Sequence, residues 1–250
     1  MTKSRLSSRI AAVLAAVGAA GTAQAADWYT GVEGDGVRDD YIVAVDVSAS
    51  VTSNSSAFGV VTGTLAPITP LNESGARIRL QGLAGVYTYP NSAGRTVRGQ
   101  QEEATAMFGY EWIWQQAALA GYVGFNVRNN ELSILDPRNP VVGTGVGAKF
   151  AADLYLNPTV DSLVSVNASY STLFRAYYVR AKAGFAVADG VFVGPEVTLL
   201  GDAFFNQWRV GAHLTGFAIG PMKFSLGAGY TRDRIQKGGY YTTVEARAAF

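Results

Sequence analysis

The sequence predicts an all-β protein, namely a transmembrane antiparallel up-and-down β-barrel of the bacterial outer membrane. Three observations carry this prediction: a secretory start, many segments of about ten residues with alternating hydrophobicity, and a last segment that closes on Phe250. Alternation of this kind places successive side chains toward lipid and toward a polar lumen. We expect about 12 strands, and a count of 10 to 14 is compatible with the pattern.

The first residues have the three parts of a secretory signal peptide. Basic residues at 3, 5 and 9 precede an apolar run over 10–20, and Ala23-Gln24-Ala25 is a small-x-small cleavage site. The apolar run is too short to span a bilayer as a helix. We therefore expect a cleaved signal peptide over residues 1–25. Residues 26–40 are interpreted as a periplasmic lead-in, with an additional short strand as the alternative, and residues 41–250 as the barrel.

Twelve candidate strands follow in order: 41–50, 57–66, 76–88, 99–111, 115–128, 144–156, 162–173, 176–187, 190–200, 205–217, 221–232 and 239–250. The alternation is clearest in 176–187 and 221–232, where every second residue is apolar and the intervening ones are polar, charged or small. Segment 57–66 has too few charges to fix its register.

The last strand carries a further signal. Tyr240, Thr242, Val244 and Phe250 share one face, which has no charge, whereas Glu245 and Arg247 share the other. A terminal Phe on such a strand resembles the closing strand of bacterial outer-membrane barrels. The resemblance implies two partners, the outer-membrane lipid and the barrel assembly machinery, which would contact the Phe250 strand.

The connections support the same topology. Barrels of this kind keep both termini in the periplasm, with long loops outside and short turns inside. Counting back from the last strand places 89–98, 129–143 and 233–238 outside, and the tight turns 188–189 and 218–220 inside. The segment 67–75 is the main exception.

Composition excludes several classes of function. Removing the three basic residues of the signal peptide leaves 17 Lys and Arg against 19 Asp and Glu, so there is no basic field for nucleic acid. The chain has no Cys, hence no disulfide and no thiolate metal site. We expect no cofactor and no bound metal.

Chemistry in a barrel would lie in the lumen, where the predicted register places a set of charged side chains of mixed sign: Arg77, Arg79, Glu103, Lys149, Asp153, Arg180, Lys182, Glu196, Arg209, His213, Glu245 and Arg247. Charges in a narrow interior persist when they are paired, so a structural network is the favoured interpretation. The alternative is a selectivity lining, with Arg77 and Arg79 on one strand and Arg180 and Lys182 on another attracting anionic solutes.

His213 is the only histidine, so any Ser-His-acid hydrolase would have to use it. The chain has no G-x-S-x-G motif, and a hydrogen-bonded lumen histidine is the favoured interpretation. One histidine without Cys also supplies no metal-ligand cluster.

Aromatic residues near strand ends predict the girdles of a barrel. We expect Trp28, Trp112 and Trp114 near the periplasmic side, and Tyr87, Tyr89, Tyr230 and Tyr240 near the outer side. An alternative for Phe204, Phe205 and Trp208 is stacking on a glycan. The lumen itself is predicted to be charged and poor in aromatics.

Several segments between residues 118 and 215 resemble, in order, the cellulose biosynthesis protein BcsS family. They are Gly121-Tyr122-Val123-Gly124, the loop from Leu135 to Gly143, Ser169 to Thr172 continuing to Tyr177 and Arg180, Val193-Gly194-Pro195-Glu196, Leu200-Gly201, Gln207, and Arg209-Val210-Gly211. The resemblance implies an outer-membrane barrel associated with cellulose synthesis and secretion, and it supplies no catalytic motif.

Two functional classes follow. The favoured one is a non-enzymatic outer-membrane accessory of cellulose biosynthesis and secretion, contacting secretion components or glucan. The alternative is a small-solute channel, with a preference for anions; a hydrolase that uses His213 is less favoured. We expect the external loop 129–143 to contact the partner through Asp136, Arg138 and Asn139, because Pro137 and Pro140 restrict its backbone. A rigid lid over the lumen is the other interpretation of this loop.

Overall fold

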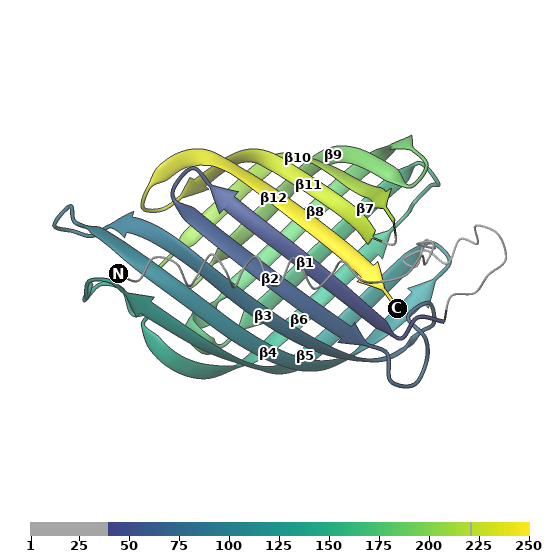
Figure 1. Ribbon diagram of the computed structural model, residues 1–250, viewed down its shortest axis with the longest axis horizontal. Coiled ribbons are helices and arrows are strands. Elements are labelled where there is room, and N and C mark those ends of the chain that lie inside the picture. The colour runs from purple at the N-terminus through teal and green to yellow at the C-terminus, as the bar shows by residue number, and fades with distance from the viewer. Residues whose placement is uncertain (1–39, 221) are drawn as a thin grey trace.

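The described residues form one closed barrel of twelve antiparallel strands (Figure 1). The computed structural model describes residues 40–220 and 222–250. Each strand pairs with the next along the chain, and β12 pairs with β1 to close the sheet. The strands are β1 (Val43–Thr52), β2 (Ser56–Leu65), β3 (Gly75–Pro90), β4 (Thr96–Trp114), β5 (Ala117–Leu132), β6 (Gly143–Leu156), β7 (Ser162–Ser171), β8 (Tyr177–Ala188), β9 (Val191–Gly201), β10 (Asn206–Ile219), β11 (Met222–Asp233) and β12 (Lys237–Ala249).

The predicted fold class and strand number are confirmed. A short 3₁₀ turn, η1 (Leu173–Arg175), connects β7 to β8. The predicted signal peptide (1–25) lies outside the described residues, as do Trp28 and the lead-in over 26–40 except for its last residue. Within the described part of the chain, no helix is long and apolar enough to cross a membrane.

The alternation of side chains fixes which face of each strand meets lipid. On β11, Leu226 is 41% exposed whereas its neighbour Ser225 is 6% exposed. The same two-residue period runs through most of β4, where Phe108 is exposed and Met107 is buried. Closure of the barrel supplies the strand-to-strand hydrogen bonds that a lipid-embedded sheet edge would lack. The buried faces of all strands therefore converge on one lumen.

Strands β3, β4 and β5 are longer than the sequence predicts. They have 16, 19 and 16 residues, whereas a tilted strand needs about 9–11 residues to cross the bilayer. The hairpin of β3 and β4 consequently projects beyond the other strands at the end opposite the C-terminus (Figure 1). The outer connections predicted at 89–98 and 129–143 shrink to 91–95 and 133–142, because the ladder hydrogen bonds of these strands continue past the predicted strand ends.

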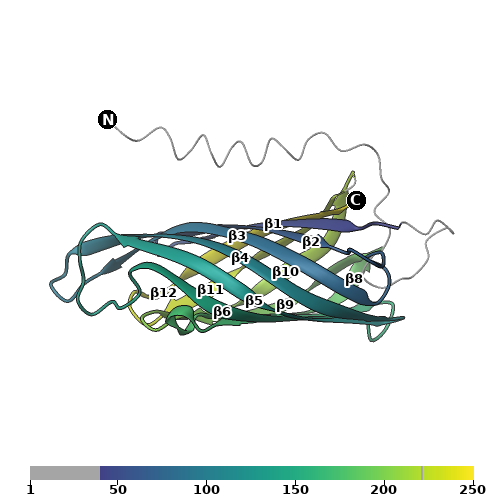
Figure 2. The same cartoon turned by 90° about the horizontal axis from the view of Figure 1, so that it is seen from below.

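We call the end of the barrel that carries Phe250 the inner end, and the opposite end the outer end. The barrel is broader in Figure 1 than in Figure 2, which views it after a quarter turn about its long axis, so its cross-section is flattened. Flattening brings facing walls of the lumen closer together than a circular section of twelve strands would. Long side chains on one wall can then reach the other.

Aromatic side chains on the lipid face gather near both ends. Trp112 and Trp114 are exposed at the inner end, and Trp208, Tyr230 and Tyr240 form a connected outward row at the outer end, with ring centroids 5.7 Å and 6.4 Å apart. These residues are the predicted girdles.

The girdle prediction is wrong for Tyr87 and Tyr89, which lie on the same face of β3 as Arg77 and therefore point into the lumen. Their position near a strand end gave no information about the face, which the register alone decides.

Candidate functional site in the lumen

One half of the lumen is organised around Glu103 on β4. Its carboxylate accepts hydrogen bonds from Arg128 Nε at 2.7 Å, from Lys149 Nζ at 2.6 Å and from the Thr105 hydroxyl at 3.2 Å. Lys149 on β6 also donates to Gln81 on β3 at 3.0 Å. We call these five residues the Glu103 cluster. It joins β3 to β6 through the interior, in addition to the backbone ladder.

A second ion pair lies nearer the inner end of the same half. Arg79 on β3 meets Asp153 on β6 at 2.6 Å, and its guanidinium also lies over the Tyr122 ring at 3.7 Å from the centroid. Asn167 on β7 donates to the other oxygen of Asp153 at 3.0 Å. The Arg79 guanidinium is therefore held in one orientation, because its flat face stacks on the Tyr122 ring and its N–H edge pairs with the Asp153 carboxylate.

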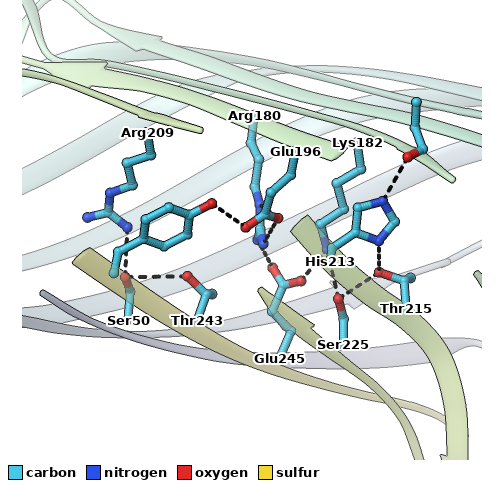
Figure 3. A network of polar contacts seen from close by, with 12 residues as sticks. Ser50, Arg180, Lys182, Glu196, Arg209, His213, Thr215, Ser225, Thr243 and Glu245 are labelled. Carbon is cyan, nitrogen blue, oxygen red and sulfur yellow. Dashed lines mark hydrogen bonds and ion pairs between the residues drawn. The ribbon is translucent and has the colours of Figure 1, made fainter. Parts of the chain in front are cut away.

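The other half of the lumen is organised around two carboxylates (Figure 3). Glu196 on β9 accepts hydrogen bonds from Arg180 Nη2 at 2.6 Å and Nε at 3.2 Å. Glu245 on β12 accepts from Arg180 and from Lys182 Nζ, the latter at 2.5 Å, and Lys182 also donates to Ser225 at 2.9 Å. We call these five residues the Glu245 cluster. It links β8 to β12, four strands apart around the barrel.

Arg209 on β10 differs from the other lumen cations that were predicted. It donates to the Ser50 hydroxyl at 2.7 Å (Figure 3). It also donates to the Gln207 side chain at 2.8 Å and lies 5.3 Å from the centre of the Tyr241 ring. No carboxylate of the described residues forms an ion pair with it. Neutral hydroxyl, amide and ring partners therefore solvate this guanidinium.

His213 is buried, and both of its ring nitrogens have partners. Nε2 donates to the Ala183 carbonyl at 3.1 Å, so Nδ1 of the neutral ring accepts from the Thr215 hydroxyl at 3.0 Å (Figure 3). Thr215 is itself 2.8 Å from Ser225, which connects the histidine to the Glu245 cluster. A hydrolase triad needs the ring between a carboxylate and a nucleophile, and this ring contacts a carbonyl and a threonine instead.

The inner end contains the two remaining predicted arginines. Arg77 is completely buried, pairs with Glu111 at 2.8 Å, and donates to the Pro70 and Glu73 carbonyls of the turn between β2 and β3. Arg247 pairs with Asp46 across the seam of β12 and β1 at 3.2 Å. The long inner segment predicted at 67–75 is thus folded onto the barrel through Arg77. That interaction explains why a long connection occurs on the side where turns are short.

The outer end is covered by inward-folded loops. In the connection 133–142, Asn139 donates to the Tyr89 hydroxyl at 3.1 Å and accepts from the Val141 backbone at 2.9 Å. Asp136 and Asn139 are buried, whereas Arg138 is 61% exposed around its side chain. The expected outward presentation of three side chains therefore holds only for Arg138. Asp136 Oδ1 accepts a hydrogen bond from the Arg138 backbone at 3.2 Å, which closes a turn within the loop, and its Oδ2 is buried.

A second loop, 202–205, reaches the same point from the opposite side of the barrel. Phe204 packs on Tyr89 with ring centroids 5.1 Å apart. Asp202 accepts backbone hydrogen bonds from Phe204 and Phe205 at 2.9 Å, and it lies 4.0 Å from Arg128. Burial raises the pKa of the Asp202 carboxyl, while these two N–H donors and the arginine oppose the shift. The two loops meet over Tyr89.

The predicted lumen residues all lie inside the barrel, but they form separate clusters rather than one lining. Arg77, Arg79, Arg180 and Lys182 each have a carboxylate partner, so they do not make a free basic ladder. Arg128 and Glu111 were missed because the predicted strands ended at these positions. Gln81 and Thr105 were missed because uncharged polar residues carry little signal in an alternating pattern. Within the described ranges, no group of His, Asp and Glu is arranged to hold a metal ion.

A family model described as "Cellulose biosynthesis protein BcsS" matches residues 45–250. The chain belongs to this family. The match extends well beyond residues 118–215, where the sequence resemblance was most distinctive. The structure locates the segments that resemble the BcsS family. The loop 133–142 covers the outer end, and Arg180, Glu196 and Arg209 lie in the lumen. No curated protein matches the chain.

Solved structures share the architecture at low sequence identity. The COG4313 outer membrane channel from Pseudomonas putida F1 is 10% identical, with a TM-score of 0.53, over 91% of this chain and 100% of that chain. The transport unit of the autotransporter AIDA-I from Escherichia coli is 8% identical, with a TM-score of 0.48, over 88% and 93%. A KdgM porin is 10% identical, with a TM-score of 0.46, over 83% and 99%. The likeness to the COG4313 channel concerns the fold alone.

The fold, the girdles and the family together assign the location. This BcsS-family protein is a β-barrel of the bacterial outer membrane, in contact with lipid on its outward face. Cellulose biosynthesis is the process to which the family belongs.

Proposed function

We propose that this BcsS-family barrel is a non-enzymatic outer-membrane accessory of cellulose biosynthesis and secretion, and that it supports export rather than serving as the conduit for the polymer. Its partners in this role are secretion components or the emerging glucan. The observation that carries the proposal is the pair of polar clusters that occupy the lumen from facing walls.

The Glu103 cluster joins β3 to β6, and the Glu245 cluster joins β8 to β12. A glucan chain threading the barrel would have to separate charges that are paired in the interior. Removing one partner from a buried ion pair costs about 3–5 kcal/mol. Conduction of a neutral polymer would require both clusters to open at once, and the free-energy cost of separating their ion pairs opposes this.

The second candidate function is a small-solute channel. Glu245 retains 30% exposure of its side chain, and Tyr178 on the inward face of β8 is 38% exposed, so water reaches part of the lumen. Twelve strands lie between filled eight-stranded barrels and open pores of 16 to 18 strands. Anion preference is less favoured because the basic residues predicted for it are paired.

Genetic removal tests the proposal directly. In a cellulose-producing host, deletion of the gene should change cellulose output or fibre morphology, and a plasmid copy should restore it. Uptake of a small chromogenic solute across the outer membrane is the matched control. Altered cellulose with unchanged permeability supports the accessory role.

Planar-bilayer recording separates the two functions. The purified barrel should give no steps or only small ones. Large, stable, anion-selective steps that disappear when Arg180 and Lys182 are changed to Glu would favour the channel, as would unchanged cellulose together with reduced solute uptake.

A further inference from the structure

The outer half of the lumen has an aromatic surface that the charge pattern of the sequence does not predict. Phe58 on β2 and Tyr87 on β3 point inward, and their rings are nearly parallel, with an interplanar angle of 11° and centroids 6.4 Å apart. Tyr87 and Tyr89 continue the row at 6.2 Å and 17°. The row then ends at Phe204, which covers Tyr89.

Glycines on the neighbouring strands seat these rings against the wall. A Cβ at Gly85 would overlap the ring of Phe58, and a Cβ at Gly99 would overlap the ring of Tyr87. Each ring therefore rests on the backbone of the next strand, where a side chain would otherwise stand. With one face against the wall, the other face is turned to the lumen. Phe58 and Tyr87 are both half-buried, so part of each ring is accessible.

Amide side chains continue the same row of the barrel wall. Phe58 is paired with Gly85, Gly85 with Gln101, and Gln101 with Asn130, so these positions lie side by side on four consecutive strands. Asn130 is 1% exposed, yet neither its amide nitrogen nor its amide oxygen has a hydrogen-bond partner. A buried amide without partners costs free energy, and such a group calls for a physical explanation. A ligand that hydrogen-bonds there would supply one.

The chemistry of this row selects a class of ligand. Pyranose rings present flat C–H faces that stack on aromatic rings, and their hydroxyls both donate to and accept from amides. Arg128 near this wall pairs with Glu103 at 2.7 Å. Arg209 donates to Ser50, the β1 neighbour of Phe58, and its other partners are a neutral amide and the Tyr241 ring. A neutral sugar chain fits this combination, because stacking on the rings and hydrogen bonds between hydroxyls and amides require no charged group on the ligand.

We propose that Phe58, Tyr87 and Asn130 form a binding site for a segment of neutral glucan chain in the outer half of the lumen. The inference rests on the proposed accessory function and names the ligand and its site. The loop 133–142 and Phe204 close the outer side of this site over Tyr89, and the Glu103 cluster closes its inner side. The glucan is held at the outer end without passing through the barrel.

Calorimetric titration of the refolded barrel in detergent micelles with cellohexaose tests the site. Tyr87→Ala and Phe58→Ala should each weaken binding roughly tenfold, because a stacked ring contributes about that factor. Tyr87→Phe keeps the ring and should bind like the wild type. Tyr240→Ala is the matched control: it removes an aromatic residue at the same end on the lipid face, 73% exposed, and should leave binding unchanged.

Asn130→Ala distinguishes a ligand-binding residue from a structural one. Because its amide has no partner in the described structure, its removal should weaken cellohexaose binding without lowering the urea midpoint of unfolding. A lowered midpoint with unchanged binding would show a structural role and overturn the assignment of Asn130. Heat-modifiable migration on gels verifies that each variant is a folded barrel.

Three results would overturn the site. The first is absence of cellohexaose binding both in the wild type and in Asn139→Ala, which loosens the loop over Tyr89. The second is tighter binding of oligogalacturonate than of cellohexaose, which would indicate an anionic ligand. The third is normal cellulose in a host that carries Tyr87→Ala, when deletion of the gene changes cellulose; this outcome leaves the accessory function standing. Unchanged cellulose after deletion would instead refute the accessory function, whatever the titration shows.

Discussion

Glu103 and Glu102 are adjacent on β4 and allow the same substitution to be compared on the two faces of the barrel. Glu103 points into the lumen, where its side chain is 3% exposed and pairs with Arg128 and Lys149. Glu102 points outward near the outer end and is exposed. Glu→Gln preserves the shape of the side chain and removes its charge, so any difference between the two variants reports the lumen contacts.

The expected cost follows from those contacts. Breaking a buried ion pair by removing one partner costs about 3–5 kcal/mol. The lower end applies to Glu103→Gln, because the amide oxygen still accepts one hydrogen bond and Asp202 remains 4.0 Å from Arg128. Lys149 keeps only the neutral partners Gln81 and Thr105. We expect Glu103→Gln to lower the free energy of unfolding by about 3 kcal/mol, and Glu102→Gln to change it by less than about 0.5 kcal/mol.

Urea unfolding of the barrel in lipid vesicles, followed by tryptophan fluorescence, measures both values. Heat-modifiable migration before the titration verifies that both variants start as folded barrels. Equal losses for the two variants would refute the assignment of faces on β4. A Glu103→Gln loss below about 1 kcal/mol would show that water, rather than the carboxylate, stabilises Lys149 and Arg128.

Three other outcomes test the register, the outer loop and the closing strand. Leu226→Arg places a charge on the lipid face and should cost about 2–4 kcal/mol in the same vesicle titration; a cost near zero would show that this position does not meet lipid. Asn139→Ala removes the hydrogen bonds to Tyr89 and to the loop backbone, so limited proteolysis should cleave within 133–142 faster than in the wild type. Equal cleavage rates would show that these two hydrogen bonds do not hold the loop in place. Phe250→Ala keeps the backbone pairing with Val43, so refolding into vesicles should proceed normally while the amount of barrel assembled in the outer membrane of cells falls; equal amounts in cells would argue against recognition of this residue by the assembly machinery.

The number of strands could be predicted because the two-residue period is a local property of the chain. In 221–232 and 239–250 the alternation of apolar with polar or small side chains indicates which face of the strand each residue occupies. The structure places Leu226 and Ser225 on the faces that this pattern predicts. Strand ends were less predictable, since the ladder of β3 and β4 continues past the predicted strand ends to the pair of Pro90 and Thr96, beyond the segments whose alternation marks a strand. Arg128 and Glu111 were missed because each is the last residue of a predicted strand, although they pair with Glu103 and Arg77.

The sequence by itself determined the fold class, the closed up-and-down topology and most of the charged residues in the lumen, because lipid on one face and water on the other impose a residue-by-residue alternation. Only the tertiary structure decided which charges pair, since Arg180 and Glu245 lie 65 positions apart and meet across a flattened barrel. It also decided that Tyr87 lies inside against Gly99 rather than in a girdle. Those contacts depend on the register and curvature of the whole sheet, which no single strand contains.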